Sequence, residues 1–136
     1  MTDAALLAKR LAQIETSVTE LRTMARPEAI PHDLREQRFV EHTLQIAIQA
    51  ALDVASHVVS DRRLGEPRTN RELFDLLARD GWIPGALAES LRRMVGFRNI
   101  LVHGYDDVDL RVVQDVVVNH LDDLLAFVDA IRGRAK

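Results

Sequence analysis

Apolar residues recur along most of this chain at spacings of three and four, which is the period of an α-helix that buries one face. The first run places one apolar residue in every turn, at Ala4, Leu7, Leu11, Ile14, Val18 and Leu21. We predict a helix that begins at Thr2 or Asp3, either of which is a good N-terminal cap, and ends near Met24. Such a narrow apolar seam indicates packing along one long neighbouring helix.

A longer second helix is predicted after a linker that contains Pro27 and Pro31. Proline lacks the amide hydrogen and restricts the residue before it, so it separates helices. The second helix should span about Asp33 to Ser60, with an alanine-rich apolar face that permits close packing. Its other face is polar and carries His42, Gln45, Gln49, Asp53 and His57.

Asp53 and His57 form a second-rank candidate site on this polar face. They are four residues apart, so their side chains lie one above the other on a helix. Such a pair can bind a metal or shuttle protons, although a polar contact at a helix interface is the more common reason for it. We therefore assign it no role from the sequence alone.

Shorter elements are predicted in the second half of the chain. The range Asp61–Arg68 contains glycine and proline and is expected to be a loop. Thr69 and Glu72 have the spacing of a capping box, which predicts a short helix that runs to Asp80 and is ended by Gly81.

Two further helices complete the expected fold. One begins near Pro84 and ends at Gly104, and the last runs from a cap at Asp109 to about Arg132. The helical spacing of apolar residues in the last segment outweighs the strand propensity of its many valines. We predict an all-α, single-domain antiparallel bundle of about five helices over residues 1–136.

Composition narrows the classes of function. The chain has 136 residues, 47% of them hydrophobic and 29% charged, which is ordinary for a globular domain. Its net charge of −3 argues against non-specific coating of nucleic acid, and we expect no DNA partner. The absence of cysteine excludes disulfides and thiolate chemistry. No apolar run is long enough for a membrane span or a signal peptide, so we expect a cytoplasmic protein without a membrane partner.

The residues with plausible chemistry lie together near the end of the fourth predicted helix, between Phe97 and Tyr105. Arg98 falls in the middle of the apolar arc of that helix, where a charge is costly unless it is paired or lines a polar cleft. Asn99 and His103 are four apart and share the flank of that arc. We expect this segment at the mouth of a groove between the last two long helices.

This segment resembles a known motif. Arg98 and Asn99, followed by three apolar residues and then His103, Gly104 and Tyr105, resemble the Arg-x4-His-x-Tyr motif of the HEPN superfamily. The likeness is to the HepT-like toxins that are paired with minimal nucleotidyltransferase antitoxins. It covers most of the chain and includes the runs Ala51–His57, Phe74–Gly81 and Met94–Asn99. It implies a helical bundle, a homodimer that joins two motif-bearing faces, and a larger hetero-oligomer with the antitoxin, without a cofactor.

The resemblance implies an endoribonuclease that cuts RNA, a tRNA or an mRNA, without metal. Such cleavage needs a base for the 2′-hydroxyl and an acid for the leaving 5′-oxygen, and histidine suits both roles. In this interpretation His103 transfers protons, Arg98 stabilises the charge of the pentavalent phosphate, and Asn99 orients the phosphate or His103. The products would be a 2′,3′-cyclic phosphate and a 5′-hydroxyl. A two-metal nuclease would need a cluster of acidic residues and histidines near the motif, and the sequence has none there, so we do not expect that mechanism.

Tyr105 has a separate expected role. The resemblance implies that the cognate nucleotidyltransferase attaches AMP to it, which would fill the cleft meant for RNA. Gly104 departs from many members of the family and leaves the position of Tyr105 less constrained. Two alternatives stay open: a non-catalytic nucleotide-binding or adaptor subunit of a nucleotidyltransferase, which needs Arg98 without a titrating His103, and a purely structural adaptor, which needs Arg98 in a buried ion pair.

Overall fold

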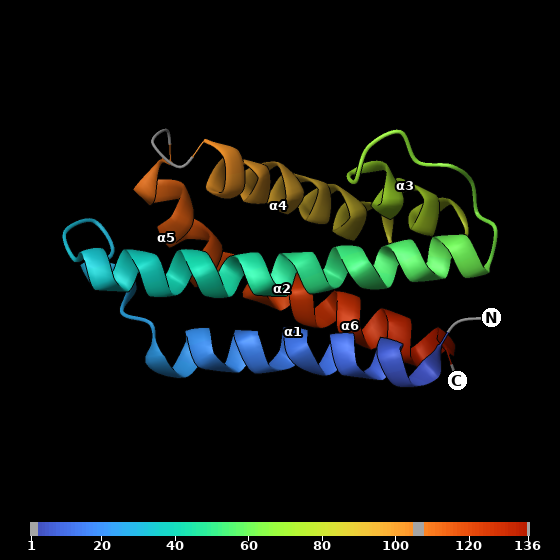
Figure 1. Ribbon diagram of the computed structural model, residues 1–136, viewed down its shortest axis with the longest axis horizontal. Coiled ribbons are helices and arrows are strands. Elements are labelled where there is room, and N and C mark those ends of the chain that lie inside the picture. Colours follow the sequence, from blue (N-terminus) through green and yellow to red (C-terminus); the bar gives the residue numbers. More distant parts are fainter. Residues whose placement is uncertain (1–2, 105–107, 136) are drawn as a thin grey trace.

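The computed structural model describes residues 3–104 and 108–135, and these residues form six α-helices, one short 3-10 helix and no strand (Figure 1). The elements are α1 (Ala4–Met24), η1 (Pro27–Ala29), α2 (Leu34–Asp61), α3 (Glu72–Arg79), α4 (Gly85–His103), α5 (Leu110–Asn119) and α6 (Leu121–Ala135). The prediction of an all-α bundle is confirmed.

The two long N-terminal helices, α1 and α2, form an antiparallel pair (Figure 1). Each begins at an aspartate whose side chain accepts two backbone N–H groups: Asp3 those of Ala5 and Leu6, and Asp33 those of Arg35 and Glu36. A cap of this kind stabilises a helix by about 1 kcal/mol. The predicted seam of α1 is buried at every position except Ala4. The prediction of a single neighbour is wrong, because α1 packs on α6 as well as along α2.

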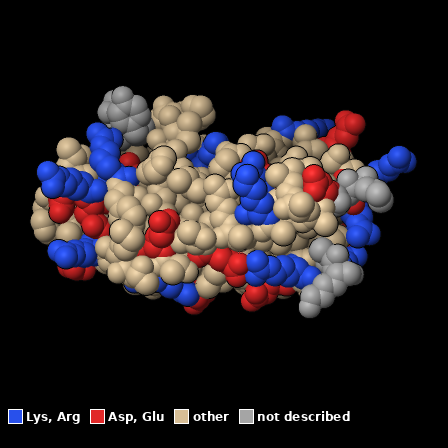
Figure 2. Space-filling model, turned by 60° about the horizontal axis from the view of Figure 1, so that its bottom comes forward, with Lys and Arg blue, Asp and Glu red and all other residues tan. Residues whose placement is uncertain are grey.

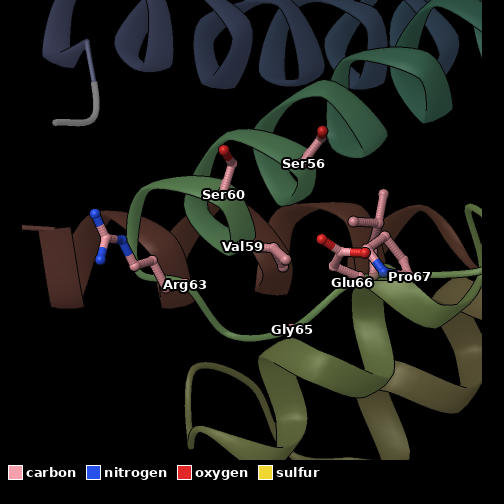
Figure 3. A pocket seen from close by; sticks show the side chains of 8 residues that line it. Ser56, Val59, Ser60, Arg63, Gly65, Glu66 and Pro67 are labelled. Carbon is pink, nitrogen blue, oxygen red and sulfur yellow. The ribbon is translucent and has the colours of Figure 1, made fainter.

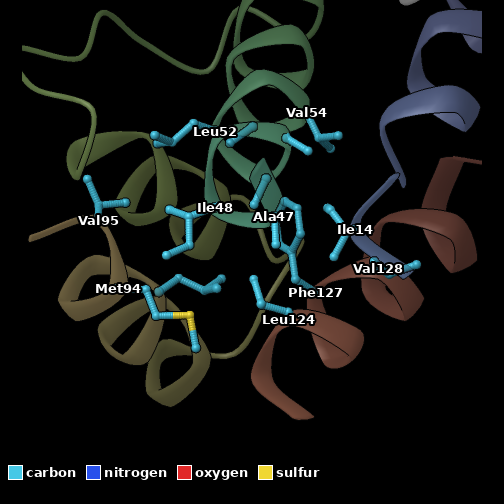
Figure 4. Packing of buried hydrophobic residues seen from close by; sticks show 14 of the residues in the cluster. Ile14, Ala47, Ile48, Leu52, Val54, Met94, Val95, Leu124, Phe127 and Val128 are labelled. Carbon is cyan, nitrogen blue, oxygen red and sulfur yellow. The ribbon is translucent and has the colours of Figure 1, made fainter. Parts of the chain in front are cut away.

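The hydrophobic core surrounds α2, which contacts α1, α4 and α6. Figure 4 shows Ile14 of α1, Ile48 of α2, Met94 of α4 and Phe127 of α6 pointing into one interior. Alanines on α2 are fully buried and let the neighbouring helices approach closely. Phe127 also packs edge-to-face on Phe74 of α3, with ring centroids 5.7 Å apart. α2 is therefore the frame against which the motif helix α4 is placed.

The prediction of one continuous last helix is wrong, because that segment forms two helices, α5 and α6, which are separated at His120. Polar side chains at the break bond locally: Asn119 donates to Asp115, and the His120 ring lies 3.1 Å from Asp115 and 3.4 Å from Asp123. Local side-chain bonds of this kind compete with helical continuity. The break gives six α-helices where about five were expected.

The predicted capping box at Thr69 is also wrong. The helix begins one turn later, at Glu72, after an N-cap position at Arg71 that has no side-chain cap. The Glu72 carboxylate instead accepts the backbone N–H of Arg68. Gly81, with φ of +78°, ends the segment after α3 as expected.

A clamp of two arginines on one tryptophan holds the far end of the bundle together. Trp82 is only 5% exposed, and the guanidinium groups of Arg62 and Arg134 lie over its ring, with their Cζ atoms 5.6 and 4.6 Å from its centroid. Asp80 accepts the indole N–H and also bonds Arg134 through its backbone oxygen at 2.6 Å. This clamp joins α2, the turn before α4, and the last turns of α6.

None of the described helices is long and apolar enough to cross a membrane.

Candidate functional site

The guanidinium group of Arg98 is half-buried between α4 and α2 and is held by amides. Its Nη2 donates to Oε1 of Gln49 at 2.6 Å, and its Nη1 donates to Oδ1 of Asn99 at 3.3 Å. Its Nε is buried without a partner, and among the described residues no carboxylate forms an ion pair with it. The positive charge of Arg98 is therefore positioned but not neutralised.

Gln49 connects Arg98 to α1. Its Nε2 donates to Oδ1 of Asp53 at 3.0 Å, and the other carboxylate oxygen of Asp53 lies 3.6 Å from Nε of Arg10. Both ends of the Gln49 amide are thus engaged, which fixes its orientation. The sequence predicted Gln49 on the polar face of α2 but gave it no role. The sign that a polar partner was needed is Arg98 itself, because a charge on the apolar arc of α4 requires one.

The groove beside Arg98 is not where the sequence led us to expect it. It lies among α1, α2 and α4 rather than between the last two long helices, because Arg98 points toward α2. A hollow of about 250 Å³ opens there. It is lined by Arg10 and Gln13 of α1, by His42, Gln45, Ile46, Gln49, Ala50 and Asp53 of α2, and by Arg98 of α4.

His103 is the last residue of α4, and its side chain is exposed. The N–H of Gly104 closes the helix by donating to the Ile100 oxygen at 2.8 Å. No hydrogen bond joins the His103 and Arg98 side chains, since Arg98 is held against α2. Tyr105 lies outside the described residues.

The surface around His103 is unusually apolar. Ile100 is 47% exposed and Val102 is 36% exposed. The apolar spacing of the sequence predicts Val102 on the same buried arc as Leu91 and Leu101, and the exposure of Val102 contradicts that prediction. Two large apolar side chains on the turn that ends in His103 indicate a surface suited to a partner.

The second-rank pair, Asp53 and His57, lines a neighbouring hollow of about 480 Å³. The two side chains are not bonded to each other, since Asp53 is engaged by Gln49 and Arg10. In the part of the chain that the structure describes, no group of three or more histidines and acidic residues is arranged to hold a metal ion.

A third hollow, of about 260 Å³, lies at the other end of the polar face, beside Glu41 and Leu101. Burial raises the pKa of the Glu41 carboxyl, and the charge of nearby Arg38 partly offsets this rise. Glu41 therefore carries its negative charge less readily than an exposed glutamate does.

Another hollow, of about 460 Å³, lies where the segment after α2 passes the start of α3 (Figure 3). Arg63 points away from Glu66 in this view, so their charges do not converge on one point. We assign no site there. On the face shown in Figure 2, basic and acidic side chains are interspersed, and neither sign covers a continuous area.

Comparisons with known proteins identify the family of this chain. The described residues form a bundle of six α-helices, and the guanidinium of Arg98 on α4, which has no carboxylate partner there, lies in a polar site against α2. A family described as "Ribonuclease HepT-like" matches residues 10–131, so the chain belongs to the HepT-like family of the HEPN superfamily.

Three relatives are informative. The chain is 39% identical over 101 residues to "mRNA nuclease HepT" of Shewanella oneidensis, which covers 74% of this chain and 76% of that protein. It is 38% identical over 74 residues to "tRNA nuclease HepT" of Aphanizomenon flos-aquae, covering 54% and 50% of the two chains. Its fold matches the tri-AMPylated HEPN toxin of S. oneidensis in complex with MNT antitoxin, with a TM-score of 0.89, 32% identity, and coverage of 98% and 100%.

Proposed function

We propose that this protein is the toxin of a toxin–antitoxin pair and acts as a metal-independent endoribonuclease. Arg98, His103 and Asn99 are its proposed catalytic residues. Relatives named as mRNA and tRNA nucleases support RNA as the substrate. The complex of a similar toxin with MNT antitoxin supports a minimal nucleotidyltransferase as the partner.

The observation that carries this proposal is the environment of Arg98. A half-buried guanidinium whose partners are neutral amides keeps its full charge for an incoming phosphate. A carboxylate partner would have cancelled that charge, as the structural-adaptor alternative requires. The geometry therefore favours a site that binds phosphate over a site that only stabilises the fold.

A homodimer would complete the site. His103 is exposed and not bonded to Arg98, so one chain offers one proton-transferring group where the reaction needs an acid and a base. The exposed Ile100 and Val102 on the same turn support a two-fold contact at this place. Two copies of His103 would then face one cleft.

The test is incubation of purified protein with total RNA in excess EDTA, followed by end-group analysis. We expect 2′,3′-cyclic phosphate and 5′-hydroxyl ends from the parent and none from His103→Ala. The matched control is His32→Ala, because His32 is also an exposed histidine but lies in the turn before α2. Circular dichroism should show all three proteins folded.

Equal cleavage by the parent and by His103→Ala would disprove the catalytic role of His103. If neither cleaves, and the intact mass matches the unmodified chain, the alternative of a nucleotide-binding or adaptor subunit gains support.

We further propose that the antitoxin silences the protein by adenylylating Tyr105. The tri-AMPylated state of the similar toxin supports this, and Tyr105 is the single tyrosine of the chain. Incubation with an MNT-type nucleotidyltransferase, ATP and Mg²⁺ should add one or more AMP units to the intact mass and abolish cleavage. Tyr105→Phe should gain no mass and keep its cleavage activity; a mass gain in that variant would point to another acceptor.

A further inference from the structure

The three hollows on the polar face of α2 form one continuous surface, which we call the α2 trough. The hollow beside Arg98 shares Arg10 and Asp53 with the hollow toward the end of α2, and it shares His42 and Gln45 with the hollow toward its start. From Arg38 to Ser60 the trough follows α2 for about 33 Å, at a rise of about 1.5 Å per residue. A surface of this length is much larger than one phosphate requires.

The charge of the α2 trough differs from that of the whole protein. The chain has 18 basic and 21 acidic residues. The trough has three arginines, Arg10, Arg38 and Arg98, and two carboxylates, Glu41 and Asp53. The trough is thus a locally basic strip on an acidic protein, which attracts a polyanion.

Two of these arginines are suited to successive phosphates. Arg98 is held by Gln49, and the same Gln49 leads through Asp53 to Arg10. The ion pair of Arg10 with Asp53 is loose, at 3.6 Å, and the Arg10 side chain is 33% exposed. Such a pair contributes little to stability, so Arg10 can leave Asp53 for a phosphate.

Beside Arg98, toward the start of α2, the trough contains polar groups that the fold does not use. The side chains of His42 and Gln45 make no hydrogen bond with any described residue, although both line the hollow beside Arg98. Single-stranded RNA is recognised through stacking on rings and hydrogen bonds to base edges and 2′-hydroxyls, which an imidazole and an amide can supply.

We propose that the α2 trough binds the single-stranded RNA that flanks the cut, with Arg10 on a phosphate next to the one at Arg98. This inference rests on the proposed ribonuclease function and extends its substrate from one phosphodiester to a strand of several nucleotides. Arg10 binds substrate but takes no part in the chemistry.

The test is steady-state cleavage of a single-stranded oligoribonucleotide by the parent and by Arg10→Ala. We expect KM to rise roughly tenfold for Arg10→Ala, because a charge-assisted contact is lost, while kcat stays unchanged. The slope of log affinity against log salt should become shallower by about 0.7, the loss of one phosphate contact on a single strand. A dinucleotide, too short to reach Arg10, should be cleaved equally by both proteins.

The matched control is Arg132→Ala. Arg132 of α6 also forms an ion pair with a residue of α1, Glu15, at 2.8 and 2.6 Å, but lies outside the trough. It should change neither KM nor the salt slope. A second variant, Asp53→Asn, keeps Arg10 and removes its carboxylate partner, and should lower KM even if Arg10→Ala folds poorly.

The outcomes separate the two proposals. If Arg10→Ala cleaves RNA with the same KM and the same salt slope as the parent, the proposal that the trough binds RNA is wrong, and the proposed ribonuclease function stands. The KM of Arg10→Ala could instead depend on the protein concentration, with sedimentation showing a weakened dimer. In that case the trough is an interface between copies of the chain and the proposal is wrong. No cleavage of any RNA by the parent removes the proposed function and this inference together.

Discussion

Two arginines of the bundle, Arg98 on α4 and Arg134 on α6, show how differently the same side chain can be used. Arg134 has a charged partner: it lies over the Trp82 ring and donates to the backbone oxygen and carboxylate of Asp80. Arg98 has only neutral amide partners and a buried Nε without a partner. Since the charge of Arg134 is paired with a carboxylate and the charge of Arg98 is not, we infer that Arg134 stabilises the fold and Arg98 awaits a ligand.

The largest effect on stability should come from the clamp around Arg134. Trp82→Ala removes a ring that is almost fully buried and should lower the free energy of unfolding by about 3–5 kcal/mol. Chemical denaturation at equilibrium measures this change. Trp82→Phe is the control, because it keeps a buried ring and loses the hydrogen bond to Asp80, which should cost about 1 kcal/mol. Similar losses in both variants would contradict a clamp that depends on the ring.

The largest effect on cleavage should come from Arg98. Arg98→Ala removes the cation proposed to stabilise the pentavalent phosphate and should lower the cleavage rate by about 10²–10³-fold. Arg98→Lys, which keeps the charge without the planar fork, should fall in between. Single-turnover cleavage of one oligonucleotide measures all variants.

Arg134→Ala is the control that tests the comparison directly. It should leave the cleavage rate unchanged and lower the free energy of unfolding by about 1–2 kcal/mol, since it loses a hydrogen bond and a cation–π contact. Loss of cleavage in a folded Arg134→Ala protein would contradict the inference that Arg134 only stabilises the fold.

A smaller effect is expected at Gln49, which orients Arg98. Gln49→Leu leaves a guanidinium nitrogen without its partner and should lower the single-turnover cleavage rate roughly tenfold, because loss of one charged hydrogen bond costs about 1.5 kcal/mol. Gln37→Leu is the matched control on the same helix, since Gln37 bonds only the Ile30 oxygen at 2.7 Å. It should lose stability and keep its rate; equal rates in the two variants would contradict the positioning role.

The smallest effect should be seen at Glu41. Burial raises the pKa of this carboxyl in the folded protein, so the folded state binds its proton more tightly than the unfolded chain does. The charged form therefore destabilises the protein at neutral pH, and this cost disappears as the pH falls below the usual carboxyl range. Glu41→Gln should raise the free energy of unfolding at pH 7 by less than about 1 kcal/mol. The difference from the parent should vanish near pH 3, and a constant difference would exclude the titration of Glu41 as its cause.

Much of the fold could be predicted because helices are local. The seam of α1 and the cap Asp3 depend only on residues within one or two turns, and the structure confirms them. The break at His120 was missed because no proline or glycine marks it; it comes from competing bonds of Asp115 and Asp123 to one imidazole. The capping box failed because the Glu72 carboxylate took a different backbone N–H.

The sequence by itself determined which residues form the helices of this HepT-like protein and which residues form its motif, because amphipathic periodicity and a short run from Arg98 to Tyr105 are properties of neighbouring positions. Only the tertiary structure decided that Arg98 meets Gln49, 49 positions earlier in the chain, and that Arg10 of α1 reaches the same hollow. Those contacts depend on how α1, α2 and α4 pack on a shared core. Helix packing is set by the shapes of many buried side chains together, which no local pattern specifies.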